Sequence, residues 1–162
     1  MRLLLSLLLV MLVAPMVRAA DLLEIQIPNG EVKSFSRENL ESLPQVEIRR
    51  KSGDNPERIY SGPALDVLLA KCGIAIGEKM KGDELHFVVL AKGADGYAVT
   101  LSLPELEPSI AEGKVIVALS RDHTPLSPNE GPLRLIVEKD QRPVRWVKNL
   151  VKLTVSDVAS GK

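Results

Sequence analysis

Tyr60-Ser61-Gly62-Pro63-Ala64-Leu65-Asp66-Val67-Leu68-Leu69 is the stretch that does most to decide the fold, because it contains the strongest helix signal in the chain. Apolar residues recur with i, i+3, i+4, i+7 spacing, which places them on one face of a helix. Pro63 is predicted to occupy the first helical position, and Gly73 to end the helix. The apolar face consists of Leu65, Leu68, Leu69 and Cys72.

Segments on both sides of this helix have the composition of β-strands. Short alternating or continuous apolar runs are bounded by Gly, Pro, Asn or Asp, which is typical of strands. The turn at 93–96 predicts a hairpin, while 36–44 and 103–110 are expected to form short helical turns. Loops are expected at 52–57 and 121–131. The predicted strands lie at 23–27, 46–48, 85–91, 97–101, 115–119, 133–137 and 151–155.

The order of these segments favours an α+β fold with a mixed, strand-rich sheet. Strands outnumber helices, and the two do not alternate regularly as they would in a doubly wound fold. No internal repeat or low-complexity linker interrupts the chain. We therefore expect one domain over residues 20–162, a length that can bury one hydrophobic core.

The first nineteen residues have the pattern of a secretory signal peptide. Arg2 precedes an apolar run at 3–13, and small residues follow at the expected cleavage site. Cleavage after Ala19 is predicted, which would place the protein in the periplasm or outside the cell. The apolar run is shorter than the roughly 20 residues of a membrane-spanning helix, so no membrane span is expected.

Charge and cysteine content limit the possible functions. Without Arg2 and Arg18, 19 basic residues face 21 acidic residues, and this near-neutral balance argues against nucleic-acid binding. Cys72 is the only cysteine, so no intramolecular disulfide can form. Its position on the apolar helix face predicts a buried small hydrophobe.

Few residues stand out as candidates for chemistry. The sequence has no G-x-S-x-G, H-E-x-x-H, paired C-x-x-C or P-loop motif. His86 falls in an apolar run and is expected to be structural. His123 lies in a polar loop, where a ligand contact is one of two open interpretations. Tyr97 follows the predicted hairpin turn and is a candidate to face a pocket.

Basic residues gather in sequence around Trp146. Arg134, Arg142, Arg145 and Lys148 could bind phosphate, because the guanidinium donors form a fixed fork that suits this anion. A solvated charged surface explains the same pattern. Both interpretations remain open at this level.

In order along the chain, these pieces resemble the molybdopterin-binding domain of the sulfite oxidase family. That resemblance implies an α+β domain that holds a molybdenum cofactor through one cysteine thiolate and through contacts to the pterin and its phosphate. Arg145 stands where the family often has lysine. The matching segments are 60–69 with Gly73, 95–97, 101–104, 125–126, 131–137 and 144–148.

The sequence also departs from this family. Its ligand cysteine lies in the loop before the helix, and the corresponding residues 51–60 contain none. Cys72 would lie about 15 Å from that loop, at the far end of a helix of about ten residues. Cofactor-loaded proteins are generally exported with a twin-arginine signal, and Arg2 and Arg18 are not adjacent.

Two hypotheses follow. The first is a non-catalytic periplasmic binding or accessory protein without a cofactor or metal, whose partner is a small anionic ligand or another periplasmic protein. The second is a molybdopterin-dependent oxidoreductase with an atypical metal site. The candidate binding residues are Tyr97, His123, Arg134, Arg145 and Lys148.

Overall fold

The computed structural model describes residues 21–51, 55–77, 80 and 82–160. The predicted signal peptide and part of the predicted loop 52–57 lie outside the described residues. No helix in the described part is long and apolar enough to cross a membrane.

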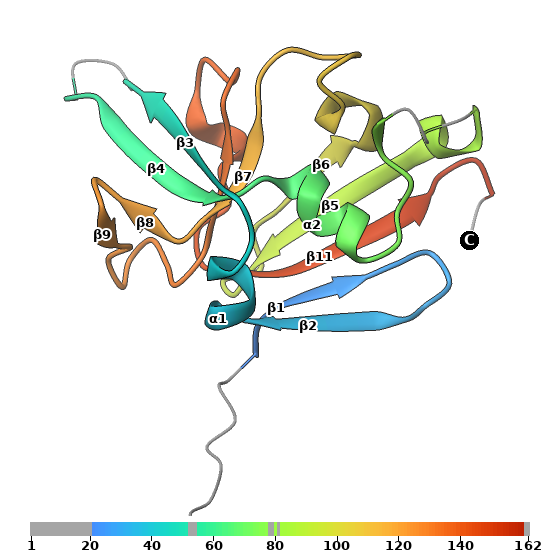
Figure 1. Ribbon diagram of the computed structural model, residues 1–162, viewed down its shortest axis with the longest axis horizontal. Helices are drawn as coiled ribbons and strands as arrows, with labels where there is room; N and C mark the ends of the chain where they lie inside the picture. The colour runs from blue at the N-terminus through green and yellow to red at the C-terminus, as the bar shows by residue number, and fades with distance from the viewer. Residues whose placement is uncertain (1–20, 52–54, 78–79, 81, 161–162) are drawn as a thin grey trace, which may run out of the picture.

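A five-stranded mixed sheet forms one side of the molecule (Figure 1). β1 pairs in parallel with β11, and the remaining neighbours are antiparallel. The first and the last strand of the described chain, β1 and β11, are therefore neighbours in this sheet. In the order of the sheet the strands are β2 (Val32–Ser36), β1 (Asp21–Gln26), β11 (Leu150–Asp157), β5 (Phe87–Gly93) and β6 (Ala98–Ser102).

Two smaller sheets complete the fold. β7 (Val115–Ala118) pairs with β10 (Arg134–Val137), and every residue of both strands is buried, which is consistent with their apolar sequence apart from Arg134. The other sheet has the order β3-β4-β8-β9 and extends to one side (Figure 1). Its strands are β3 (Gln45–Arg50), β4 (Arg58–Pro63), β8 (Ser120–Arg121) and β9 (Thr124–Pro125).

The helices are short. α1 (Arg37–Glu41) begins at a capping box formed by Ser36 and Asn39. α2 (Leu65–Lys71) buries the predicted apolar face, with Leu65, Leu68 and Leu69 fully buried. The 3-10 segments are η2 (Gly82–His86), η3 (Leu103–Leu106) and η4 (Pro143–Arg145).

One hydrophobic core joins the three sheets and α2. β4 crosses β7 so closely that a Cβ on Gly62 would lie 2.0 Å from the backbone oxygen of Val117. The absence of a side chain at Gly62 therefore allows the β3-β4-β8-β9 sheet to approach the core.

The strand-rich prediction and the mixed sheet are confirmed, while several boundaries differ. Pro63 ends β4 rather than starting the helix, because 58–63 pair with β3; the sequence pattern did not reveal this strand or β2. The predicted strand 85–91 was wrong at its start, since residues 82–86 form η2 and leave His86 exposed. The predicted loop 121–131 contains the small hairpin of β8 and β9.

Candidate functional site

Arginines from three strands of the β3-β4-β8-β9 sheet meet on the face that contacts Trp146. Arg50, the last residue of β3, lies directly opposite Arg58, the first residue of β4. Arg121 on β8 pairs in register with Tyr60 on β4. Because alternate residues of a strand share a face, Arg58 and Tyr60 point to the same side. Like charges placed opposite each other destabilise a strand pair, so this arrangement favours a bound counter-ion.

These side chains line a pocket with a volume of about 240 Å³. Tyr60 and Trp146 are buried, and their rings meet edge to face at 5.5 Å. The volume is below the ~300–1,000 Å³ of typical sites for drug-sized ligands, so the pocket suits a small ligand. Its lining is completed by Asn55, Pro56 and the three arginines.

The described lining of the pocket holds more positive than negative charge. Asp122 accepts hydrogen bonds from the Ile59 amide at 3.0 Å and from Arg58 at 2.8 Å. These contacts, the backbone hydrogen bond first, lower the pKa of Asp122 against an opposing effect of desolvation. Arg121 forms an ion pair with Glu130.

Among the described residues, Arg50 forms no ion pair with a carboxylate. Its terminal nitrogen donates to the backbone oxygen of Asp140, a neutral acceptor. Its buried Nε has no hydrogen-bond partner among the described residues. A guanidinium whose partner among the described residues is a neutral carbonyl can still bind an oxyanion or a carboxylate.

A buried ion pair of Arg134 with Glu130 lies next to Tyr60 and Trp146, the two aromatic residues of the pocket. Arg134 and Glu130 are 8% and 7% exposed, and Arg134 lies 5.6 Å and 5.5 Å from the ring centres of Tyr60 and Trp146. Glu130 therefore pairs with both Arg134 and Arg121, although its single charge balances only one of them. Counting the described residues alone, Arg50, Arg58, Arg121 and Arg134 contribute four positive charges, against the two carboxylates of Asp122 and Glu130.

The structure brings three of the five predicted residues together. Tyr97, Arg134 and Lys148 line a neighbouring pocket of about 370 Å³, which shares Trp146 with the arginine pocket. Tyr97 is half exposed, and its hydroxyl donates to the backbone oxygen of Val144. The prediction that Tyr97 faces a pocket agrees with this geometry.

The other two predicted residues lie elsewhere. His123 is 69% exposed in its side chain and lies 3.7 Å from Glu47. Arg145 is held by Asp140 at 2.6 Å and by Glu105 at 2.9 Å, and the hydrogen bonds to Asp140 contribute most to raising its pKa. Neither His123 nor Arg145 lines the two pockets that contain Trp146. Arg145 is therefore separated from Arg134 and Lys148, although all three are close to Trp146 in sequence or in the fold.

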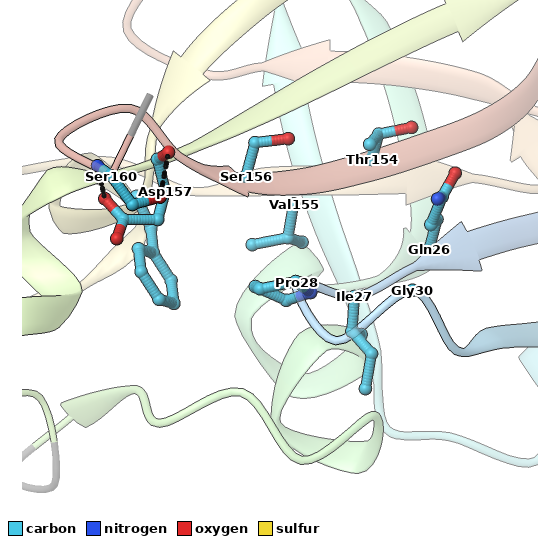
Figure 2. A pocket seen from close by; sticks show the side chains of 10 residues that line it. Gln26, Ile27, Pro28, Gly30, Thr154, Val155, Ser156, Asp157 and Ser160 are labelled. Carbon is cyan, nitrogen blue, oxygen red and sulfur yellow. Dashed lines mark hydrogen bonds between the residues drawn. The ribbon is translucent and has the colours of Figure 1, made fainter. Parts of the chain in front are cut away.

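A third pocket, of about 400 Å³, lies where β1 and β11 diverge (Figure 2). Val155 points toward Ile27 and Pro28, while Thr154 and Ser156 lie on the opposite side of β11. The Ser160 amide donates to Asp157 Oδ1 at 3.4 Å, and the Ser160 hydroxyl donates to the backbone oxygen of Asp157 at 3.3 Å. Its described lining contains no Lys, Arg or His, so an anion has no charged donor here.

Comparison with known families agrees with the resemblance seen in the sequence. Residues 36–162 match the model of the oxidoreductase molybdopterin-binding domain, the domain of the sulfite oxidase family. The chain belongs to this family. β1 precedes the matched region although it pairs with β11 inside the sheet. No curated protein is significantly similar to the chain.

The residues of this family member do not fit a molybdenum centre held through a protein thiolate. Cys72, the only cysteine, is 1% exposed, and it follows α2 instead of lining the arginine pocket. Burial raises the pKa of its thiol, although Lys33 partly opposes this shift. Within the described residues, no three His, Cys, Asp or Glu side chains are grouped as a metal site would need.

Sequence reasoning missed Arg50, Arg58 and Arg121 as site residues. Their charges are separated in the chain by loops, and only the β3-β4-β8 pairing brings them together. One signal was available, since Arg58 and Tyr60 share the i, i+2 spacing of a strand face.

Proposed function

We propose that this domain is a cofactor-free member of its family that uses an α+β scaffold to bind a small anion, and that it acts as a non-catalytic binding or accessory protein. The opposition of Arg50 and Arg58 carries this proposal. Two cations placed in register, one with an unsatisfied Nε, are stabilised when an oxyanion or carboxylate lies between them. The small volume of the pocket favours an anion over an extended cofactor.

We further propose that the protein works in the periplasm or outside the cell. The n-region, apolar run and small residues of 1–19 support export, with cleavage after Ala19. The absence of adjacent arginines before the apolar run favours export of an unfolded chain without a cofactor. Amino-terminal sequencing of protein recovered from the periplasm tests the cleavage site.

Cofactor content separates this proposal from a molybdopterin-dependent oxidoreductase with an atypical metal site. The protein should be purified from a host that makes molybdenum cofactor, and analysed for molybdenum by mass spectrometry and for released pterin by fluorescence. We expect neither signal at a stoichiometric level in folded protein. Both signals at near one per chain would establish the oxidoreductase alternative, which the family membership supports.

Anion binding is tested by calorimetric titration with phosphate, sulfate and acetate. Arg58→Ala and Arg50→Ala should each weaken binding at least ~10-fold, because a charge-assisted hydrogen bond contributes about 1.5–3 kcal/mol. Arg49→Ala is the matched control, since Arg49 is exposed on β3 and lies 4.0 Å from Glu47. Equal losses in all three variants would show only a general effect of net charge.

A further inference from the structure

An exposed apolar surface lies beside the arginine pocket. Tyr97 and Val144 are 48% and 54% exposed, and they line the pocket shared by Arg134, Trp146 and Lys148. Pro143 adds a third exposed apolar group to the same lining. Aromatic and aliphatic side chains grouped on a surface are typical of contacts with another protein.

This surface is held in place from several sides. The Tyr97 hydroxyl joins the β5-β6 hairpin to η4 through the backbone oxygen of Val144. Trp146 Nε1 donates to the backbone oxygen of Val137 at 3.0 Å. The ion pairs of Arg145 with Asp140 and Glu105 fix the other end of η4. A surface fixed before binding loses little conformational entropy when a partner docks.

The charge at its edge selects the kind of partner. Lys148 lines the pocket, and Arg142 directly precedes the lining residue Pro143 in the chain. Both cations are exposed, and neither forms an ion pair with any described residue. Asp95, the carboxylate of this pocket, accepts a hydrogen bond from the Tyr97 amide at 2.9 Å. Two unpaired cations next to an apolar surface are complementary to carboxylates next to an apolar residue.

We propose that Tyr97, Pro143, Val144 and Lys148 form a docking surface for an acidic segment of a partner protein that presents an apolar side chain. The apolar residue packs against Val144 and Tyr97, and flanking carboxylates pair with Lys148 and Arg142. This inference rests on the proposed accessory role, since it names the chemistry of the partner. It does not require the arginine pocket to bind an anion.

The test uses isotope-labelled protein and three synthetic peptides. The first is acetyl-Glu-Asp-Leu-Phe-Glu-Asp-amide; the second replaces its acidic residues with lysine, and the third replaces Leu-Phe with Ser-Ser. We expect only the first peptide to shift the amide resonances of residues 95–97, 142 and 144–148 by NMR. Equal binding of the lysine or serine peptide, or no shift with ~1 mM of the first, would overturn the proposal.

Substitutions locate the binding. Val144→Asp and Lys148→Glu should each weaken the first peptide at least ~10-fold, and both residues are exposed, so the fold should persist. Val158→Asp is the matched control, because Val158 is 61% exposed and lies outside this pocket. Equal loss in the control would refute the site. A dimer that Val144→Asp dissociates would identify a second copy as the occupant, against the proposal.

One more variant separates this inference from the proposed anion site. Arg58→Ala, in the arginine pocket, should weaken phosphate binding at least ~10-fold and leave peptide binding unchanged. If phosphate binding fails in the unmodified protein while the peptide still binds, the anion proposal is wrong and the docking surface stands. If phosphate binds and the peptide does not, the docking surface is wrong.

Discussion

Glu130 and Arg134 form an ion pair in the interior, with both residues less than one-tenth exposed. The other oxygen of Glu130 pairs with Arg121, which lines the arginine pocket. Ser127 donates to the same carboxylate at 3.2 Å. One buried carboxylate thus positions a pocket residue and neutralises a cation that packs against Tyr60 and Trp146.

Glu130→Gln should destabilise the protein by about 3 kcal/mol or more. Removal of one partner from a buried ion pair leaves the other charge uncompensated, which costs about 3–5 kcal/mol. The measurement is the free energy of unfolding from urea titration, with unchanged slope as evidence that the native fold persists. Glu112→Gln, which alters the exposed pair of Glu112 with Lys139, should change stability by less than about 0.5 kcal/mol.

Asp122→Asn should tighten phosphate binding about 2- to 5-fold. Asp122 competes with an anion for Arg58, and solvent keeps this exposed ion pair weak, so only a modest gain in affinity is expected when its charge is removed. Asparagine also tolerates the positive φ of 51° at this position. Calorimetric titration measures the change. Weaker binding in this variant would show that Asp122 organises the arginines more than it competes with the ligand.

The same carboxylate predicts a pH dependence. Its pKa is lowered in the folded protein, so its contribution to stability is present above its ordinary value of 3.8 and is lost as the pH falls through the lowered pKa. When unfolding is measured at a series of pH values below about 5, Asp122→Asn should therefore lose less stability than the unmodified protein as the pH falls below the ordinary value of 3.8. Parallel curves would contradict this assignment.

Gly62→Ala should destabilise the fold by more than about 3 kcal/mol. The new Cβ would meet the backbone of Val117 and Ala118, which cannot move as a flexible side chain would. Thermal unfolding followed by circular dichroism measures the effect. Gly82→Ala is the matched control, because a Cβ there meets no atom within 4 Å. A similar loss in both variants would contradict the close β4-β7 crossing.

Cys72 should react slowly with thiol reagents in the native protein at pH 8 and rapidly in urea. It is 1% exposed, and burial raises its pKa above the ordinary 9.0, so little thiolate forms. Because the unfolded thiol loses its proton first, stability should fall as the pH rises above about 9. Cys72→Ala should remove that dependence. Rapid native labelling would show that the thiol is accessible.

Arg145→Ala should reduce stability by about 1 kcal/mol and leave phosphate binding unchanged. Arg145 is 35% exposed in its side chain, so solvent weakens its pairs with Asp140 and Glu105, and it lines no part of the arginine pocket. Urea unfolding and calorimetry check the two parts. If the oxidoreductase alternative holds, Arg145→Ala and Arg134→Ala should instead lower cofactor occupancy in a folded protein.

The elements that local patterns predicted are those whose neighbours in sequence are also neighbours in space. The apolar face of α2, the Ser36 cap of α1 and the hairpin at 93–96 all depend on contacts within a few residues. β2 and β4 were missed because their sequences are mostly polar or rich in Gly and Pro, and partner strands stabilise them. Pro63 illustrates this, since pairing with β3 outweighed its preference for a helix start.

By itself, the sequence determined the strand-rich fold, the family and the burial of its only cysteine, because hydrophobic periodicity and ordered motifs are properties of the linear chain. Only the tertiary structure decided which cations share a site. Long-range pairing placed Arg50 against Arg58, and Tyr60 against Arg121. Arg145 instead pairs with Asp140 and Glu105 and lies outside the pocket that Arg134 lines. Side chains close in sequence separated, since each charge joins whichever opposite charge the packed backbone brings nearest.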